Sequence, residues 1–582
     1  MRCSLGVGKW LLVVLAAGWI CGTSRLQANP RPNVILILTD DQGYGDLHAH
    51  GNPVIRTPEM DRLWAQSVRL TNFHVDPTCS PTRSALMTGR YSTRTGVWHT
   101  VMGRSMMAPE ELTLAEIFAA NGYRTAMIGK WHLGDNYPLR AEDQGFQHVV
   151  RHGGGGVGQT PDAWGNDYFD DRYWKNGHVE SFQGYCTDVW FREAIQFIRR
   201  NRRRPFFLYL ATNAPHGPYR VPEHYRQPYT RQGVSRPMDA FYGMITNLDE
   251  NLGRLRRELR RLGLERNTLL IFMTDNGTAA GWRPRARRPV ARGFNAGMRG
   301  TKGSNYEGGH RVPCFFYWPD GGLVGPRDVD QLAAHIDILP TLVELCRLQK
   351  PPGPPVDGVS LVSALRGNRH VLRNRVLFVH SQRIPRPQMW RRFAVMTQRW
   401  RLTAQNELYD LQADPGQQRN VAQQYPGVVR LLRQAYRQWW DSLTPTFDRY
   451  VRIHIGSSHE LVTRLTAHDW HCPEIKQCPW NQGLIQRGVP GNGFWALSVE
   501  RPGRYELRLR RWPPEVDKPL EATEAAVEIA GQKLSQPVKP RQAEAVFVLR
   551  LPAEATQLRT ELRRPEAPPR GAYYVLIRRL GE

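Results

Sequence analysis

Four short apolar runs, each followed at once by polar side chains, constrain the fold of this chain more than any other feature. Two of them, Asn33–Thr39 and Thr268–Thr274, are continuous stretches of β-branched, leucine and similar residues. Such runs, without polar positions in alternation, are typical of strands covered on both faces. The other two runs are 124–128 and 205–210, and helical segments separate the runs. This order predicts an α/β domain with a mostly parallel central sheet and helices on both faces.

The polar residues that follow these runs form a candidate site. The carboxyl ends of parallel strands share one edge of a sheet, where open α/β sheets bind their ligands. We therefore expect one group of residues to converge: Asp40, Asp41, Lys130, His132, His216, Asp275 and Asn276. Asp40-Asp41 alone, or Asp275-Asn276 alone, would be interpreted as ordinary turn or cap residues. Two such pairs after two buried strands indicate an all-oxygen site for a hard divalent cation, Ca2+ first and Mg2+ second.

A cysteine opens a segment with the signals of a helix start. Pro81 suits the first turn, and Ser80 is predicted to be the N-cap. Cys79 would then lie at the positive end of the helix, where an anion or a deprotonated nucleophile is favoured, and Arg83 follows one turn later. A lone cysteine is most often a small buried apolar side chain. Because this one occurs together with the polar cluster, we expect it to take part in chemistry.

The rest of the chain is predicted to hold a covering loop, a subdomain and a further domain. The catalytic domain is expected over 29–443, with a glycine- and aromatic-rich covering loop from 152 to about 185. Its smaller C-terminal subdomain, with antiparallel strands, should occupy about 371–443. From 444 to 582, short alternating runs between Pro/Gly turns predict an appended all-β, sandwich-like domain, with its clearest hairpin at 501–503.

The N-terminus has the pattern of a secretory signal peptide, residues 1–28. Two basic residues precede a short apolar run, and small residues mark a cleavage site after Ala28. The run is shorter than a membrane-spanning helix, so we expect an exported protein, periplasmic or secreted, with no membrane segment after cleavage. In an oxidising compartment Cys472 and Cys478 are the closest local pair for a disulfide.

The net charge of +26 raises the question of a polyanionic partner. The chain has only nine lysines against seventy arginines, a bias that the base composition of the coding sequence can produce by itself. Charge alone does not identify a nucleic-acid binder, and export makes that class of partner less suitable still. We therefore expect no nucleic-acid partner.

These residues resemble a known family, the type I sulfatases of the alkaline-phosphatase-like superfamily. Residues 79–83 fit its CxPxR signature, and residues 122–134, GYRTAMIGKWHLG, fit its second signature. The Asp-Asp and Asp-Asn pairs, the Ala-Pro-His segment and the loop of Lys302 also match. The resemblance extends over about 33–420 and includes the motifs in their family order.

The resemblance implies a chemistry for the cysteine. Cys79 would be converted after translation to formylglycine, by a formylglycine-generating enzyme or its equivalent, and the hydrated aldehyde would be the nucleophile. By the same resemblance the cation would be bound by Asp40, Asp41, Asp275, Asn276 and the modified residue 79. A sulfate ester is a poor electrophile, so a cation that binds a sulfate oxygen suits this reaction.

The resemblance also implies roles for the remaining polar residues. Arg83 would hold the hydrated residue 79, and Lys130 and Lys302 would bind sulfate oxygens by charge-assisted hydrogen bonds. His216 would bind the substrate as well and act as the general acid for the leaving alcohol. His132 would take the proton of the second hydroxyl, which expels sulfate and restores the aldehyde.

The resemblance implies that this chain hydrolyses a sulfate ester on a sulfated small molecule or glycan, and the signal-peptide pattern implies that it is exported. Three features suit a sulfated carbohydrate: the aromatic residues around 164–174, the arginine-rich loop 282–292 and the β domain. The same features equally suit a solvated rim and a structural appendage. The closest alternative is a formylglycine-dependent phosphonate monoester or phosphodiester hydrolase. A binding or scaffold protein that keeps only the fold would lack a ligand or the nucleophile, and this sequence lacks neither.

Overall fold

The computed structural model describes residues 31–582, except 284–291, 369–371, 373 and 404–405. The predicted signal peptide, 1–28, and most of the arginine-rich loop lie outside the described residues. Within the described part of the chain, no helix is both long enough and apolar enough to cross a membrane.

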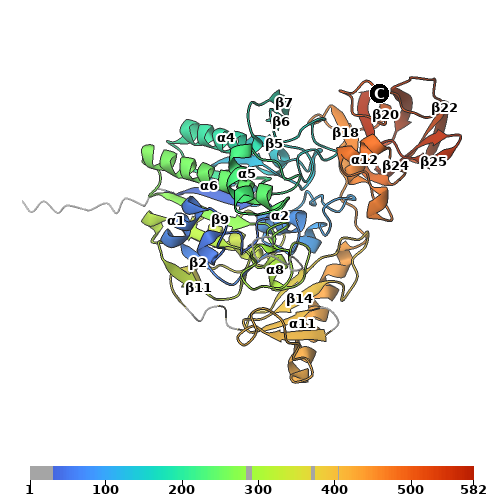
Figure 1. Cartoon of the computed structure of the whole chain (residues 1–582). Coiled ribbons are helices and arrows are strands. Elements are labelled where there is room, and N and C mark those ends of the chain that lie inside the picture. The colour runs from blue at the N-terminus through green and yellow to red at the C-terminus, as the bar shows by residue number, and fades with distance from the viewer. Residues whose placement is uncertain (1–30, 284–291, 369–371, 373, 404–405) are drawn as a thin grey trace, which may run out of the picture. The chain divides into compact units, whose positions relative to one another are not determined.

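A mixed sheet forms the core of the catalytic domain, and among the described residues it contains ten strands (Figure 1). Its centre is parallel, as predicted, with the strands in the order β9 (Thr268–Thr274), β1 (Asn33–Thr39), β8 (Phe206–Ala211), β4 (Arg124–Gly129) and β5 (His148–Arg151). The edges contain antiparallel pairs and consist of β10 (Cys314–Tyr317), β2 (Val68–Leu70), β11 (Arg327–Val329), β6 (Arg172–Lys175) and β7 (His178–Ser181). All four predicted apolar runs are central strands.

Side chains of β1 alternate between two hydrophobic cores, one on each face of the sheet. Val34 and Leu36 belong to one cluster of buried residues, and Ile35 and Ile37 belong to the other. The first cluster includes α3 (Leu114–Ala120) and α9 (Ile338–Leu345), and the second includes α1 (Pro58–Gln66), α4 (Cys186–Asn201) and α6 (Met238–Arg261). Helices on both faces explain why β1 has no polar position from Val34 to Leu38.

The predicted subdomain is present as a four-stranded antiparallel sheet with one helix. Its strands follow chain order: β13 (Leu377–His380), β14 (Phe393–Met396), β15 (Trp400–Thr403) and β16 (Glu407–Asp410). Helix α11 (Pro426–Leu443) shares a core with these strands, and that core also contains Ala85 and Tyr91 of the catalytic domain. Ahead of this subdomain, Ala333–Ala334 forms a short strand, β12, and α9 begins at Ile338.

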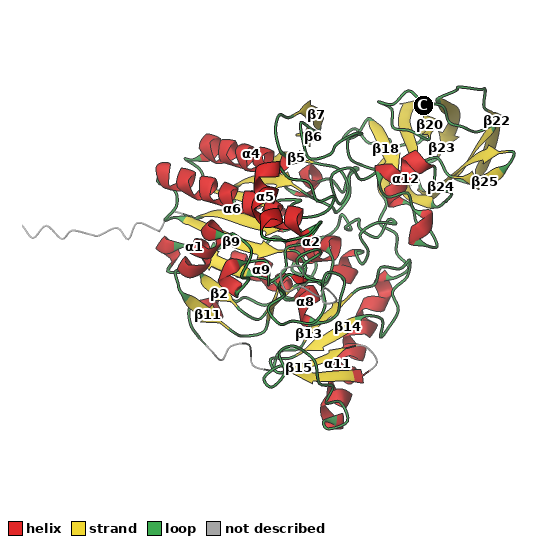
Figure 2. Ribbon diagram, viewed as in Figure 1, coloured by secondary structure: helices red, strands yellow, loops and turns green. Residues whose placement is uncertain are grey.

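The C-terminal residues form two β-sheets around one core, which confirms the sandwich-like domain (Figure 2). One sheet contains β17 (Ile453–Ile455), β19 (Phe494–Val499), β24 (Ala555–Arg564), β21 (Glu524–Ile529), β22 (Gln532–Pro537) and β25 (Ala567–Arg570). The other contains β18 (Val462–Thr466), β26 (Tyr574–Gly581), β20 (Gly503–Arg510) and β23 (Glu544–Leu551). The predicted hairpin at 501–503 is wrong, because β19 and β20 lie in different sheets. That turn carries the chain from one sheet to the other.

The predicted covering loop, 152–185, contains the β6–β7 hairpin and contacts the C-terminal domain through backbone hydrogen bonds. The N–H of Thr160 donates to the carbonyl of Trp480 at 3.1 Å, and the N–H of Gln482 donates to the carbonyl of Gly158 at 3.1 Å. Cys472 and Cys478, the predicted pair, are both buried thiols in the structure rather than a disulfide. Burial and the neighbouring thiol of Cys472 raise the pKa of Cys478.

Candidate active site

Cys79 is the first residue of α2 (Cys79–Thr88), so it lies at the predicted end of the helix, although the helix begins two residues before Pro81. The predicted cap is wrong, because Thr78 is the N-cap, and no side chain caps the helix there. The hydroxyl of Ser80 instead donates to the carbonyl of His132 at 3.0 Å. Every residue of α2 is buried, so this helix is fixed on all sides and holds Cys79 in one position.

Two pairs of metal-binding candidates lie together because their strands are neighbours. The last residues of the parallel strands β1 and β9 pair in register. The residues that follow leave the sheet together: Asp40, Asp41, Asp275 and Asn276. The N–H of Asp41 donates to Oδ1 of Asp275 at 3.1 Å. Asp41 has a φ of 70°, in the left-handed region that Asp tolerates better than most residues. The predicted convergence of the two pairs is therefore present.

Two buried cations contact Asp40 and Asp275. Nζ of Lys130 lies 2.5 Å from Oδ2 of Asp40. Arg83 donates to Oδ2 of Asp275 from Nη2 at 2.7 Å and from Nε at 3.2 Å, and to the carbonyl of Lys130 from Nη1 at 2.9 Å. All four side chains are fully buried. Burial of a carboxylate requires this pairing, because an uncompensated charge inside a protein is costly.

A third cation, Lys302, contacts Asp41. Its Nζ lies 2.5 Å from Oδ1 of Asp41, and Nε2 of His216 lies 3.9 Å from Oδ2. Burial raises the pKa of Asp41, but Lys302 and His216 outweigh that effect and hold the pKa below its usual range. Burial lowers the pKa of Lys302, whereas Asp41 and Cys79 raise it above the usual value. Both groups are therefore charged at neutral pH.

Unpaired oxygen atoms show that the cluster fits a divalent metal. Oδ1 of Asp40 and Oδ1 of Asn276 are buried and have no hydrogen-bond partner among the described residues. Nδ2 of Asn276 donates to Oδ1 of Asp41 at 2.9 Å, which leaves the amide oxygen as a free ligand. One atom each of Asp40, Cys79 and Asp275 lies within 4.8 Å of the others. Burial and the charge of Asp40 raise the pKa of Asp275 to about 6, a repulsion that a bound cation would relieve.

The tautomers of the two predicted histidines follow from the carbonyls that they contact. Nε2 of His132 lies 2.9 Å from the carbonyl of Thr100, so Nε2 carries the hydrogen, and Nδ1 is buried without a partner among the described residues. Nδ1 of His216 lies 2.6 Å from the carbonyl of Gly217, so Nε2 is the basic nitrogen. Burial and Lys130 hold the pKa of His132 well below 6.5. Burial and Lys302 lower the pKa of His216 to about 3, so both rings are neutral.

Two cavities open onto these groups. The smaller, of about 100 Å³, is lined by Cys79, His132, His216 and Lys302. The larger, of about 550 Å³, shares His216 and Lys302 with it. Lys130 lines neither cavity. The smaller cavity also has lining residues to which the sequence assigned no role, including Thr100, Gln159, Arg383, Ile475 and Trp480. They come from loops in distant parts of the chain, and no motif marked them.

The glycine run of the covering loop packs directly on both histidines. A Cβ atom on Gly155 would lie 2.2 Å from Cε1 of His132. A Cβ atom on Gly156 would lie 3.3 Å from the ring of His216. The glycine run is visible in the sequence, where it predicts only a covering loop and no contact with the histidines. Its absent side chains make room for the two imidazole rings, so the glycines belong to the candidate site.

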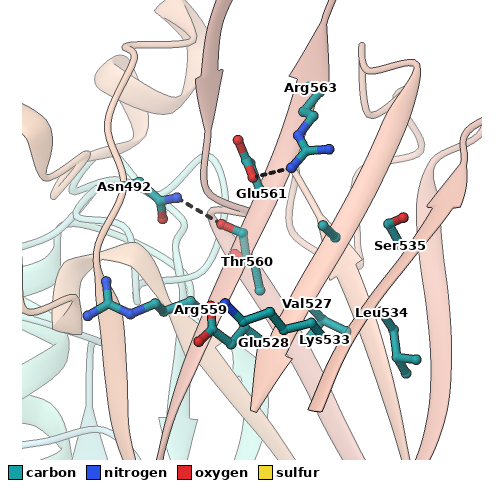
Figure 3. Close-up of a pocket in the computed structure, with 11 residues that line it drawn as sticks. Asn492, Val527, Glu528, Lys533, Leu534, Ser535, Arg559, Thr560, Glu561 and Arg563 are labelled. Carbon is teal, nitrogen blue, oxygen red and sulfur yellow. Dashed lines mark hydrogen bonds and ion pairs between the residues drawn. The ribbon is translucent and has the colours of Figure 1, made fainter. Parts of the chain in front are cut away.

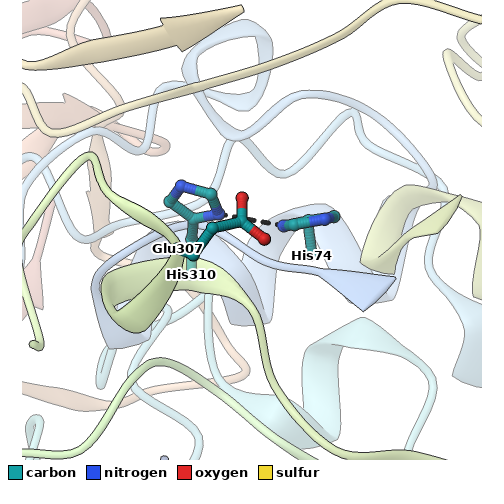
Figure 4. Close-up of side chains that lie close together, drawn as sticks. All are labelled: His74, Glu307 and His310. Carbon is teal, nitrogen blue, oxygen red and sulfur yellow. Dashed lines mark hydrogen bonds between the residues drawn. The ribbon is translucent and has the colours of Figure 1, made fainter. Parts of the chain in front are cut away.

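A second group of possible metal ligands consists of His74, Glu307 and His310 (Figure 4). It differs from the acidic cluster in that its side chains already contact one another and Arg401. The Nδ1 atoms of the two histidines are 2.9 Å apart. Nε of Arg401, from β15, donates to Oε1 of Glu307 at 2.7 Å, and its Nη2 lies 3.3 Å from Nε2 of His74. Both ring nitrogens of His74 are already engaged, Nδ1 by the ring of His310 and Nε2 by Oδ1 of Asn72 at 2.8 Å. We interpret the cluster as a buried network that joins the subdomain to the catalytic domain.

A further cavity, of about 410 Å³, is lined by residues of β21, β22 and β24 in the C-terminal domain (Figure 3). Its charged groups pair with other residues of that domain: Arg563 lies 3.0 Å from Glu561, and Lys533 lies 3.5 Å from Glu528. None of its lining residues belongs to the predicted catalytic or metal-binding set. The smaller cavity at Cys79 is therefore the candidate active site.

Two family models match this chain. The model described as Sulfatase matches residues 32–347, which is more than half of the chain. The model described as N-sulphoglucosamine sulphohydrolase, C-terminal, matches residues 301–439. Together they span the catalytic domain and the subdomain, and they leave out the C-terminal β domain.

Individual proteins match over much of their length. Arylsulfatase A of Homo sapiens is 30% identical over 491 residues, 75% of this chain and 90% of the relative. N-acetylgalactosamine-6-sulfatase of Canis lupus familiaris is 30% identical over 404 residues, 64% of this chain and 72% of the relative. The crystal structure of Ps i-CgsB in complex with k-i-k-neocarrahexaose has a TM-score of 0.63 and 25% identity, over 70% of this chain and 92% of that one. The phosphonate monoester hydrolase of Agrobacterium radiobacter shares the fold, with a TM-score of 0.51 and 20% identity over 72% of this chain and 96% of that one.

Proposed function

Because this chain belongs to the sulfatase family and is a sulfuric ester hydrolase, we propose that it hydrolyses the sulfate ester of a saccharide, with formylglycine made from Cys79 and a divalent cation, Ca2+ first. One observation carries the proposal. Cys79, His132, His216 and Lys302 line one cavity, and the acidic cluster lies against it through the contact of Lys302 with Asp41. The same cavity thus combines a nucleophile precursor, a cation and two neutral imidazoles.

In this proposal the anionic sulfate group enters the smaller cavity. Lys302 supports that placement because its Nζ is charged and its side chain lines the cavity. A charge-assisted hydrogen bond to a sulfate oxygen is the expected contact. Lys130 lines neither cavity and its Nζ contacts Asp40, so its expected contact with the sulfate requires that Nζ turn from Asp40 toward residue 79. The substrate is held chiefly by charge, so activity should fall as salt concentration rises.

Each histidine has one ring nitrogen that is not committed to a backbone carbonyl and is suited to the proton transfer proposed for it. Hydrated formylglycine would supply the oxygen nucleophile and a second hydroxyl, and a cation held by Asp40, Asp41, Asp275, Asn276 and residue 79 would polarise a sulfate oxygen. Nδ1 of His132 is a buried free acceptor and suits removal of the second hydroxyl proton. Nε2 of His216 would protonate the leaving alcohol after gaining a proton, which the negative charge of a bound sulfate favours.

The proposal is tested with protein made alongside a formylglycine-generating enzyme. Mass spectrometry of the peptide that contains residue 79 measures the conversion of the thiol to the aldehyde. Turnover of 4-nitrophenyl sulfate should rise in proportion to the converted fraction and should be absent from unconverted protein. Equal activity in converted and unconverted protein would refute the role of formylglycine.

The names of the relatives motivate the saccharide. N-acetylgalactosamine-6-sulfatase is named for a sulfated sugar, and it matches at 30% identity. A panel of sulfated mono- and oligosaccharides beside 4-nitrophenyl sulfate tests this part. The alternative, a phosphonate or phosphodiester hydrolase, predicts faster turnover of bis(4-nitrophenyl) phosphate than of the sulfate. Export is tested separately, since N-terminal sequencing of protein from the periplasm or medium should begin at Asn29.

A further inference from the structure

We propose that the C-terminal β domain completes the substrate site, with the indole of Trp480 stacked on the sugar ring that carries the reacting sulfate, and that Arg383, in the loop between β13 and β14 of the subdomain, binds a second anionic group of that saccharide. This inference rests on the proposed function and assigns substrate contacts to residues outside the family signatures. It makes the appended domain a specificity element of the hydrolase.

Trp480 lies where the two cavities meet. It lines the smaller cavity beside Cys79, His132 and Lys302, and it also lines the larger cavity. Its side chain is partly buried and packs against the core of the C-terminal domain, and the residue lines both cavities. A sulfate at Cys79 places the sugar that carries it near this junction. A flat aromatic ring there suits the apolar face of a sugar, because aromatic residues supply large rigid contact areas in binding pockets.

The backbone around Trp480 holds the residue in place without help from the indole. Its carbonyl accepts from Thr160 at 3.1 Å, and Oγ1 of Thr160 donates to the carbonyl of Pro479 at 2.5 Å. The side-chain amide of Gln482 contacts the carbonyl of Ala163 at 3.1 Å. These bonds set the position of the segment against the covering loop. Substitution of the indole should therefore remove the proposed stacking surface and leave the segment where it is.

Gln159 supplies a polar group at the same junction. It lines both cavities, and its Oε1 accepts from the N–H of Gly155 at 2.8 Å. That bond fixes which end of the amide is the oxygen, so Nε2 is the end available as a donor. A Cβ atom on Gly156 would lie 3.4 Å from this Nε2 and 3.3 Å from the ring of His216. The amide thus stands beside the proposed acid and can donate to a sugar hydroxyl.

Arg383 is a cation of the smaller cavity with no carboxylate partner among the described residues. Its one hydrogen bond there runs from Nη2 to Oγ1 of Thr100, at 3.4 Å. Arg386, three residues along the same loop, is instead paired with Asp448 at 2.9 Å. An exposed guanidinium without a counter-charge, beside a site for a sulfate, is suited to a second sulfate or a carboxylate.

The first test compares Trp480→Ala with wild type on N-acetylgalactosamine 6-sulfate and on 4-nitrophenyl sulfate, with formylglycine verified in each protein. The quantity compared is kcat/KM for the sugar divided by kcat/KM for the aryl sulfate. We expect this ratio to fall about tenfold, which corresponds to the loss of one good aromatic contact. Trp480→Phe should restore most of the ratio. Lys476→Ala, in the same segment but exposed and outside both cavities, should leave the ratio and the aryl sulfatase activity unchanged.

The outcomes separate this inference from the proposed function. An unchanged ratio in Trp480→Ala, whether both activities fall together or neither changes, refutes the stacking role. If the sugar is neither hydrolysed nor able to inhibit turnover of the aryl sulfate, the inference is wrong and the sulfatase assignment stands. If converted protein does not hydrolyse 4-nitrophenyl sulfate at all, the proposed function itself is wrong.

The second test concerns Arg383. Wild type should prefer N-acetylgalactosamine 4,6-disulfate to the 6-sulfate, and Arg383→Gln should reduce that preference about tenfold, chiefly through KM. Arg386→Gln removes a neighbouring arginine that already has a partner, so it should keep the preference. A preference that is absent in wild type, or equal in wild type and Arg383→Gln, refutes binding of a second anionic group at Arg383.

Discussion

Arg83 and Asp275 form a fully buried ion pair, with Nη2 of the arginine 2.7 Å from Oδ2 of the aspartate. The pair joins the helix that begins with Cys79 to the end of β9, so it fixes the distance between the candidate nucleophile and the acidic cluster. It is therefore both a structural contact and a part of the site.

Arg83→Met should destabilise the protein strongly. Loss of one partner leaves the Asp275 carboxylate buried without its cation, which costs about 3–5 kcal/mol in such pairs. Guanidinium denaturation of the two proteins measures the difference. Arg386→Met is the matched control, because its pair with Asp448 is exposed and should contribute about 0–1 kcal/mol. Similar losses in the two variants would contradict the prediction.

Cys79→Ala should abolish sulfatase turnover and leave the melting temperature within a few degrees of wild type, since a small apolar side chain fits the buried position. Cys79→Ser should stall after one turnover, because a serine ester has no second hydroxyl to expel the sulfate. Intact-mass spectrometry after incubation with substrate would show the mass of one added sulfate. Multiple turnovers by either variant would contradict the assignment.

Gly155→Ala should impair catalysis more than Gly156→Ala. The new methyl group would lie 2.2 Å from His132 in the first variant and 3.3 Å from His216 in the second. Displacement of His132 should lower kcat by about 100-fold, the scale of a general acid–base contribution. Gly427→Ala has an open environment and serves as the control. Steady-state kinetics and far-UV circular dichroism of all three variants check the prediction, and equal activities would count against the role of the glycine run.

Removal of divalent metal should lower both activity and thermal stability. Without a cation, Asp40 and Asp275 repel each other, as the raised pKa of Asp275 indicates. Ca2+ added to chelator-treated protein should raise the melting temperature with increasing concentration, because a ligand that binds only the folded state stabilises it. Asp40→Asn should lose that response. A response that persists in Asp40→Asn would locate the cation elsewhere, and comparison with Mg2+ shows which ion the site prefers.

Stability should depend on pH through Asp46. Burial raises its pKa to about 7, from 3.8 in the unfolded chain, against the hydrogen bond that the N–H of Gly43 donates to Oδ2 at 2.8 Å. A raised pKa in the folded state means that the neutral carboxyl is favoured. The contribution of Asp46 is therefore complete below about pH 4 and is lost as pH rises through about 7. Denaturation at several pH values should show a weaker decline in Asp46→Asn, and parallel curves would contradict the assignment.

The fold was largely predictable because its signals are local. The apolar runs at β1 and β9 have no polar interruption, and the structure places them as adjacent buried strands. Two predictions were wrong, and in each case the same local sequence is compatible with two different structures. The sequence around 501–503 predicts a hairpin, but the two flanking strands do not pair with each other. Strand β19 pairs with β17 and β24, and β20 pairs with β26 and β23, and long-range contacts decide that pairing. Ser80 has a capping side chain, yet its hydroxyl donates to the His132 carbonyl instead.

The sequence alone determined the chemistry that this chain can carry, because the signatures place a cysteine, lysines, histidines and carboxylates at the ends of helices and strands that form locally. Only the tertiary structure decided what surrounds that chemistry. Thr160 and Pro479 are 319 residues apart in the chain, yet their hydrogen bond holds Trp480 beside the cavity of Cys79. Long-range packing of this kind leaves no periodic pattern or fixed spacing, so contacts such as those of Trp480, Arg383 and Gly155 emerge only when the chain is folded.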